Sequence, residues 1–135
     1  MISAITEQIY IGDQQDALNV EMLKRMKFDS VINLNHRCHL EEKQLMEENK
    51  IDYCYFDCDC SKEYFYEEMQ QALLKFIAEI RNDKKVLIHC EIGMERSPLI
   101  VAKYLSYIRN IPLNKAYNIV KYFRPQIIEH YEWDF

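Results

Sequence analysis

The ten residues HCEIGMERSP, His89–Pro98, decide the fold of this 135-residue chain. They follow Lys85–His89, an apolar run that predicts a buried strand. They lead into Leu99–Ile108, which is almost entirely apolar or aromatic and predicts a mostly buried helix beginning near Ser97 and Pro98. Gly93 lies in the loop between them and is one of only two glycines in the chain. Because glycine adopts a positive φ at no steric cost, we expect Gly93 to let this loop curl.

The rest of the chain predicts the same alternation of strands and helices. Further strands are predicted at Gln8–Ile11 (an edge strand closed by a Gly12-Asp13 turn), Ser30–Leu34 and Ile51–Phe56. Further helices are predicted at Asn19–Lys27 (with Asn19 as N-cap), Leu40–Asn49, Glu67–Ile80 and Leu113–Phe123. The sequence therefore predicts an α/β fold, with a central, mostly parallel sheet of about four to five strands flanked by helices. No linker or repeat divides the chain, so we expect a single domain over residues 1–135.

Composition narrows the class of protein. The net charge of −5 argues against nucleic acid or an anionic membrane surface as the main partner. No apolar run approaches the roughly 20 residues of a membrane span, and the first residues lack the basic region of a signal peptide. The five cysteines, an odd number, fit a reducing compartment better than a disulfide framework. We therefore expect a cytoplasmic protein that is a monomer or a small homo-oligomer.

The loop combines a nucleophile with anion-binding groups. Ligands of such sheets gather beyond the carboxyl ends of the strands, where Cys90 follows the strand. Ser97 as N-cap and Pro98 as first helical residue would mark the start of the helix. Main-chain amides that lead into a helix N-terminus favour anions and lower the pKa of a thiol. We expect the substrate-binding residues to be those of the loop: Glu91, Ile92, Gly93, Met94, Glu95 and Arg96.

These residue types suit phosphoryl transfer. The guanidinium of Arg96 can bind two oxygens of a phosphate while the Cys90 thiolate attacks phosphorus. Water then hydrolyses the cysteinyl-phosphate intermediate, with Ser97 donating a hydrogen bond to the departing sulfur. The chemistry needs neither a metal nor a cofactor. Because a thiolate stabilised by the loop needs no base, we interpret His89 as a structural residue that holds Cys90 in place.

The motif HC-x5-R-S between a strand and a helix resembles the signature loop of the protein tyrosine phosphatase superfamily, in particular its small dual-specificity branch. Three other segments are similar to that branch and occur in the same order: IYIGDQQDA (Ile9–Ala17), FDSVINLN (Phe28–Asn35) and AYNIVKYFRP (Ala116–Pro125). The resemblance covers almost the whole chain. It implies a phosphatase fold and a cysteine-based phosphatase activity.

The resemblance also implies a general acid upstream of the cysteine. That branch carries an aspartate about 30 residues before it, and Asp59 lies 31 residues before Cys90. Asp57, at a spacing of 33, is the rival. Glu95, immediately before the arginine, is similar to a glutamate of the rhodanese-like cell-cycle phosphatases, where it has been considered as the acid. Asp59 is our primary assignment, and Asp57 and Glu95 remain open.

The two glutamates of the loop bear on the substrate. Glu91 and Glu95 oppose the binding of negative charge, and Arg96 is the only cation of the loop. We therefore expect a single phosphate on a protein or small molecule rather than a polyanion. A short chain implies a shallow cleft, which favours phosphotyrosine and admits phosphoserine and phosphothreonine. The alternative is a phosphoprotein-binding pseudophosphatase with little or no turnover.

Histidines and cysteines also cluster outside this loop. HRCH (His36–His39) together with Cys54, Cys58 and Cys60 matches no standard zinc spacing, so we predict no metal site. Cys54, Cys58 and Cys60 are interpreted as buried filler. Because Cys58 and Cys60 flank Asp59, a disulfide between a neighbouring thiol and Cys90 is the alternative. Arg124-Pro125 is interpreted as a helix stop with a structural ion pair.

Overall fold

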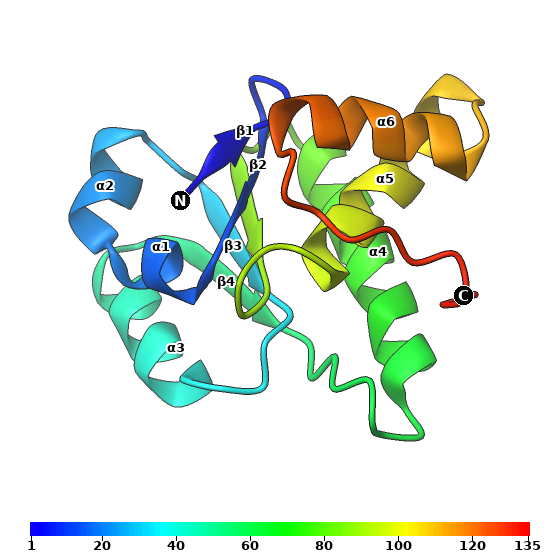
Figure 1. Cartoon of the computed structure of the whole chain (residues 1–135). Helices are drawn as coiled ribbons and strands as arrows, with labels where there is room; N and C mark the ends of the chain where they lie inside the picture. Colours follow the sequence, from blue (N-terminus) through cyan, green and yellow to red (C-terminus); the bar gives the residue numbers. More distant parts are fainter.

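A computed structural model describes residues 1–135 as a five-stranded sheet with helices on both faces (Figure 1). The elements in chain order are β1 (Ser3–Ala4), β2 (Ile9–Gly12), α1 (Gln14–Leu18), α2 (Val20–Arg25), β3 (Ser30–Asn33), α3 (His39–Glu48), β4 (Asp52–Tyr55), α4 (Phe65–Arg81), β5 (Val86–His89), α5 (Arg96–Arg109) and α6 (Leu113–Phe123). None of these helices is both long enough and apolar enough to span a bilayer.

The strands lie in the order β1-β2-β5-β3-β4. Strands β2, β5, β3 and β4 run parallel, and only β1 pairs antiparallel, with β2. The predicted fold class, a mostly parallel sheet flanked by helices, is confirmed. In the register, His89 at the end of β5 lies beside Gly12 of β2 and Asn33 of β3. All four parallel strands therefore end at the same edge of the sheet.

The core has two layers because the central strands are buried on both faces. Val31 and Leu87 pack against α1–α3 in a cluster of seven buried residues. Ile32 and Ile88, their neighbours in sequence, point to the opposite face and belong to a cluster of 23 buried residues that includes side chains of α4–α6. Strands buried in this way read as continuous apolar runs, and this is why the sequence identified them.

Two short elements were not predicted. The strand β1, only two residues long, pairs with β2, so the expectation that Gln8–Ile11 forms an edge strand was wrong. Instead of the expected Gly12-Asp13 turn, Gly12 ends β2 and Asp13 is the N-cap of α1, in a reciprocal capping box with Asp16. Neither element is long enough to display hydrophobic periodicity. The predicted N-cap Asn19 does accept a hydrogen bond from the amide of Met22.

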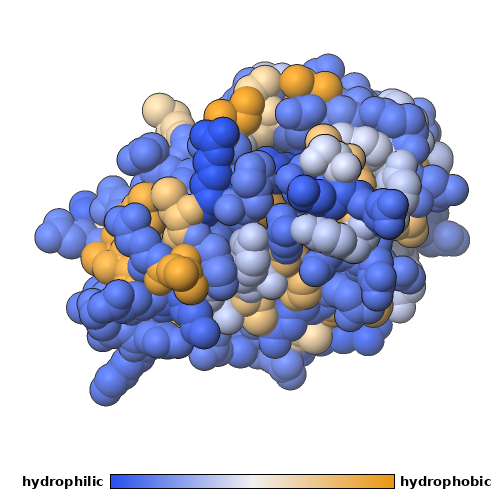
Figure 2. Space-filling view, turned by 90° about the horizontal axis from the view of Figure 1, so that it is seen from below, coloured by the Kyte–Doolittle hydropathy of each residue, from blue (hydrophilic) through white to orange (hydrophobic).

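The carboxyl ends of the parallel strands point down in Figure 1, toward the loop that follows β5. Figure 2 views this end of the molecule from below. Its surface is largely hydrophilic, with hydrophobic side chains in scattered groups. Polar side chains thus surround the edge at which the predicted site lies.

Candidate active site

The loop Cys90–Glu95 connects β5 to α5 and is shaped by its glycine. Gly93 has a φ of +70°, and a Cβ at this position would lie 2.5 Å from Nη2 of Arg124 and 2.6 Å from the carbonyl oxygen of Gly12. Both the backbone conformation and the available space therefore require glycine.

The helix after the loop begins earlier than its sequence suggested. Its first residue is Arg96, and the N-cap is Glu95, whose side chain makes no capping hydrogen bond. The prediction that Ser97 caps the helix was therefore wrong, and Pro98 is the third helical residue rather than the first. Proline is tolerated there because the amides of the first turn have no intrahelical acceptor. Ser97 is instead buried in the first turn, with its Oγ 3.3 Å from the Sγ of Cys90.

The thiol of Cys90 is buried, with 1% of the residue exposed. Burial raises the pKa of this thiol. The guanidinium of Arg96, the hydroxyl of Ser97 and the main-chain amides of Ser97 and Glu95 lower it by more, so that the pKa lies below its usual value. These groups form a cage of positive charge and donors that favours the thiolate.

The loop that follows this thiol carries donors without a partner in the protein. The main-chain amides of Glu91, Ile92, Gly93 and Met94 donate to no carbonyl and to no side chain. The Nη1 of Arg96 donates to the carbonyl oxygens of Leu34 and Cys58, both at 3.1 Å. Its Nε and Nη2 donate to no protein atom. The loop thus presents amides and one side of a guanidinium to an anion of tetrahedral shape.

The segment after β4 borders this loop, because the carbonyl of Cys58 accepts from Arg96. The carboxylate of Asp59 accepts from the hydroxyl of Ser61 at 2.7 Å and from its amide at 3.0 Å, and these hydrogen bonds hold the pKa of Asp59 below its usual value. Asp57 accepts from the hydroxyl of Tyr64 at 2.6 Å through Oδ2, while its Oδ1 is buried without a partner. The structure therefore brings Cys90, Arg96, Ser97 and the Asp57–Asp59 segment together.

The two glutamates of the loop turn outward to separate partners. The carboxylate of Glu91 accepts from Nδ2 of Asn35 at 2.7 Å and lies 4.0 Å from Nε of Arg37. The carboxylate of Glu95 lies 2.8 Å from Nε2 of His130, in the segment that follows α6. Neither carboxylate is free to swing without breaking a polar contact.

Arg124 holds the loop in place through hydrogen bonds to its main chain. The predicted helix stop is present, since α6 ends at Phe123, but the predicted ion pair is wrong, because the partners of the guanidinium are uncharged. The guanidinium, in a residue only 1% exposed, donates to the carbonyl oxygens of Gly93, Ile92, Ile11 and Met1 and to the hydroxyl of Ser3. Carbonyl oxygens replace a carboxylate because the main chain of β2 and of the loop surrounds the guanidinium.

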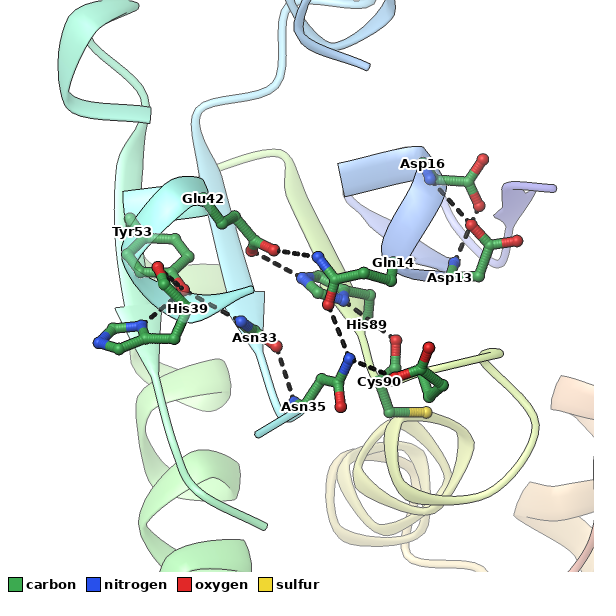
Figure 3. Close-up of polar contacts among 11 residues, drawn as sticks. Asp13, Gln14, Asp16, Asn33, Asn35, His39, Glu42, Tyr53, His89 and Cys90 are labelled. Carbon is green, nitrogen blue, oxygen red and sulfur yellow. Dashed lines mark hydrogen bonds and ion pairs between the residues drawn. The ribbon is translucent and has the colours of Figure 1, made fainter. Parts of the chain in front are cut away.

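A buried polar network behind Cys90 was missed by the sequence analysis (Figure 3). Nδ1 of His89 lies 3.1 Å from the carbonyl oxygen of Cys90, and Nε2 lies 2.7 Å from a carboxylate oxygen of Glu42. The amide of Gln14 donates to the other oxygen of Glu42 at 2.6 Å, and Asn35 donates to Gln14 at 2.7 Å. These residues come from separate elements and form no local motif. The available signal was Glu42 one turn before Met46, on the inward face of α3.

Comparison with known proteins agrees with this geometry. The family model "Dual specificity phosphatase, catalytic domain" matches residues 9–134. The tyrosine-protein phosphatase vhp-1 of Caenorhabditis elegans is 29% identical over 133 residues, which cover 98% of this chain and 20% of the nematode protein. The putative tyrosine phosphatase 123R of Invertebrate iridescent virus 6 is 27% identical over 118 residues, covering 87% of this chain and 75% of the viral one.

Among solved structures, the PTP-2 phosphatase of Cydia pomonella superposes with a TM-score of 0.80 at 17% identity, covering 98% of this chain and 84% of the other. At that identity the likeness concerns the fold alone. The match of the family model over nearly the whole chain settles the relationship. The chain belongs to the dual-specificity phosphatase catalytic-domain family.

Proposed function

We propose that this chain is a metal-independent cysteine phosphatase that hydrolyses phosphomonoesters through a cysteinyl-phosphate intermediate. The observation that carries the proposal is the buried thiol of Cys90, with a depressed pKa, at the base of a loop whose amides have no partner in the protein. An anion of the size of phosphate satisfies these donors. The family of the chain supports the same activity.

In the first step the thiolate of Cys90 attacks phosphorus, and the bond from phosphorus to the ester oxygen breaks. The unpaired amides and the free Nε and Nη2 of Arg96 stabilise the charge on the equatorial oxygens. In the second step water attacks phosphorus and the bond between sulfur and phosphorus breaks. The hydroxyl of Ser97, 3.3 Å from the sulfur, donates to the departing thiolate.

Asp59 is the proposed acid and base. It gives its proton to the leaving oxygen and, as a carboxylate, then takes a proton from the attacking water. The low pKa of its carboxyl describes the protein without phosphate. A dianion held in the adjacent loop raises that pKa, because like charges disfavour each other. Binding of substrate therefore favours the protonated form that the first step requires.

The rival acids are engaged differently. Asp57 is hydrogen-bonded to Tyr64, and Glu95 is held by His130 on the outer side of the loop. Loss of the acid flattens the basic limb of the profile of kcat against pH. We expect Asp59→Asn to do this, with Asp57→Asn and Glu95→Gln as matched controls. The assignment is wrong if either control flattens the limb while Asp59→Asn leaves it intact.

The proposed substrate is a phosphoprotein with one phosphate at the site, mainly phosphotyrosine and also phosphoserine or phosphothreonine. With 135 residues, the chain has little room for segments that would deepen the cleft, so we expect a shallow approach to Cys90. Glu91 and Glu95 add negative charge to its rim. We expect phosphotyrosine peptides to be turned over faster than phosphoinositides or RNA 5′-triphosphates, and the reverse order contradicts the proposal.

The decisive experiment is turnover of an aryl phosphate in the presence of a chelator. Activity that vanadate inhibits and that Cys90→Ser abolishes supports the enzyme. A protein that binds phosphopeptides in calorimetry, yet shows no more turnover than Cys90→Ser, is a phosphoprotein-binding pseudophosphatase instead.

Composition supports a proposal for the compartment and the partners of the enzyme. All five cysteines are unpaired thiols, which suits the reducing cytoplasm, and the charge of −5 disfavours nucleic acid as a partner. The proposed form is one domain over residues 1–135, as a monomer or a small homo-oligomer. Light scattering during gel filtration tests the assembly, and a single urea transition in both fluorescence and circular dichroism tests the domain.

A further inference from the structure

Two carbonyl oxygens in the middle of the Cys90–Glu95 loop are held by one side chain. Nη2 of Arg124 donates to the carbonyl oxygen of Ile92 at 3.3 Å, and Nε donates to that of Gly93 at 2.7 Å. Arg124 is only 1% exposed, so solvent has little access to these hydrogen bonds. Figure 1 shows the chain after α6, which begins with Arg124, close to the loop that follows β5.

A carbonyl that is held in place also fixes the direction of an amide. All peptide bonds of the chain are trans, and in a planar trans peptide the C=O of one residue and the N–H of the next point in opposite directions. The carbonyl of Ile92 therefore turns the N–H of Gly93 away from Arg124, and the carbonyl of Gly93 does the same to the N–H of Met94. Neither N–H has an acceptor in the protein. Arg124 thus determines where two free donors of the loop point.

The next peptide group indicates which side of the loop such amides face. The carbonyl oxygen of Met94 accepts from the amide of Ile128, outside the loop, at 2.7 Å. The N–H of the same peptide group belongs to Glu95, and its hydrogen bond lowers the pKa of the Cys90 thiol. A carbonyl held from outside thus accompanies an amide that faces the nucleophile.

Glycine alone does not fix this arrangement. Gly93 has a φ of +70°, and glycine adopts positive and negative values of φ about equally readily. Rotation of the Ile92–Gly93 peptide group by half a turn changes only ψ of Ile92 and φ of Gly93. It places a carbonyl oxygen, which repels a phosphate, where the N–H had pointed. The hydrogen bonds of Arg124 oppose this rotation, since it would leave the guanidinium without an acceptor in the loop.

We propose that Arg124 is a positioning residue that directs the amides of Gly93 and Met94 toward a bound phosphate. It acts through the main chain of the loop rather than by contact with the anion. Its remaining hydrogen bonds hold the guanidinium itself in place and go to three acceptors outside the loop: the carbonyl oxygens of Met1 and Ile11 and the hydroxyl of Ser3. The inference rests on the proposed function in that the ligand of the loop is a phosphate group.

The first test uses tungstate, a tetrahedral oxyanion that can bind to the loop without turnover. Amide protons move downfield when they gain a charged acceptor. In ¹⁵N-labelled wild-type protein at saturating tungstate, we expect such shifts for the amides of Ile92, Gly93 and Met94. Unshifted signals of Gly93 and Met94 overturn the proposal.

The second test removes the hydrogen bonds from the guanidinium and retains a long side chain. In Arg124→Met at saturating tungstate, we expect Gly93 and Met94 to lose their shifts. Ile92 should keep its shift, because the amide of Gln14 still holds its peptide group. Calorimetry should show tungstate binding about tenfold more weakly, the effect of one hydrogen bond to a charged group. Equal loss of all three shifts in the folded variant points to general disorder of the loop and overturns the proposal.

Arg124→Lys separates charge from geometry and provides the test if Arg124→Met does not fold. Lysine keeps the buried positive charge, but its single nitrogen does not reproduce the fork formed by Nε and Nη2. We therefore expect the shift of at least one of the amides of Gly93 and Met94 to be lost. Wild-type shifts and wild-type tungstate affinity in Arg124→Lys would show that charge alone suffices, and they overturn the proposal.

Ser3→Ala is the matched control, because it removes a hydrogen bond of the same guanidinium that does not reach the loop. We expect wild-type amide shifts and wild-type tungstate affinity, and a loss equal to that of Arg124→Met overturns the proposal. None of these readouts requires hydrolysis of a phosphate ester. The expected shifts in a protein without turnover would refute the proposed phosphatase and leave the role of Arg124 standing. Full turnover with no selective effect of Arg124→Met on the two amides would refute this inference alone.

Discussion

The sheet buries one glutamate at each end, and their partners differ. Glu79, on α4 at the amino end, contacts the hydroxyl of Ser30 at 2.9 Å, Lys84 at 3.1 Å and Lys75 at 3.8 Å. Glu42, at the carboxyl end, contacts an amide and His89. Lysines stay charged across neutral pH, whereas the charge of a histidine depends on its partner. The two buried carboxylates thus have different surroundings: Glu79 lies among lysines and a hydroxyl, whereas Glu42 lies beside an amide and the histidine that precedes the nucleophile.

The largest expected effect comes from a substitution at the carboxyl end of the sheet. We predict that Gly93→Ala lowers kcat/KM for an aryl phosphate by about 100-fold, since displacement of the loop by an ångström has effects of that order. The new Cβ would meet the main chain of Gly12 and the guanidinium of Arg124, at a φ that alanine rarely adopts.

The matched control is Gly12→Ala. Its Cβ would meet only side-chain atoms, the nearest being Oδ2 of Asp16 at 2.9 Å. We expect it to keep most of the activity. Equal losses in the two variants would show that the conformation of Gly93 is not what the loop needs.

The second prediction concerns a substitution at the amino end of the sheet. Glu79→Ala leaves the hydroxyl of Ser30, in a fully buried residue, without its acceptor and should lower the free energy of unfolding by about 2 kcal/mol. Urea denaturation measures this change. Activity per folded molecule should stay at the wild-type level, and a loss of kcat/KM would show that the two ends of the sheet are coupled.

The sequence predicted what lies close together along the chain. Cys90, Gly93, Arg96 and Ser97 fall within eight residues, so their strand–loop–helix context was readable. The central strands β3 and β5 were found because burial on both faces favours apolar residues along them, whereas the edge strand β4, which is exposed or half-buried, was found from its aromatic residues. Assignments of helix ends that rested on residue type alone were less successful. Ser97 has the residue type of an N-cap, yet its hydroxyl faces the thiol of Cys90.

Contacts between distant elements were out of reach. The network of Glu42, His89, Gln14 and Asn35 joins residues up to 75 positions apart, from Gln14 to His89, and each of them is an ordinary polar residue in its own segment. Arg124 showed the same limit, because its acceptors are carbonyl oxygens, which every residue has. Only the folded backbone reveals which of them converge.

The third prediction concerns pH at the carboxyl end. Because the pKa of Cys90 is depressed, the thiolate stabilises the fold above the pKa of the unfolded thiol, and this contribution is lost as pH falls through the folded pKa. Alkylation by iodoacetamide should therefore persist to lower pH in native protein than in urea. Cys58 is the internal control, since burial raises its pKa and it should resist the reagent. Coincident profiles for Cys90 in the native and unfolded states would contradict the expectation.

The smallest expected effect concerns a third carboxylate, which is more exposed than Glu42 and Glu79. Glu95 is 41% exposed and pairs with His130, whose ring stacks on Trp133 at 3.7 Å between centroids. Ion pairs with an exposed partner contribute about 1 kcal/mol or less, so His130→Gln should raise KM by about fivefold at most, with kcat little changed. The physical reason is that Glu95, released from His130, adds negative charge and freedom at the rim where the phosphate binds.

Steady-state kinetics on a phosphotyrosine peptide measure this change in KM, and Glu95→Gln in the same background should restore KM by removing the released charge. A fall in kcat in His130→Gln that Glu95→Gln does not reverse would place His130 itself in the chemistry, so that a half-exposed pair would matter more than the buried one.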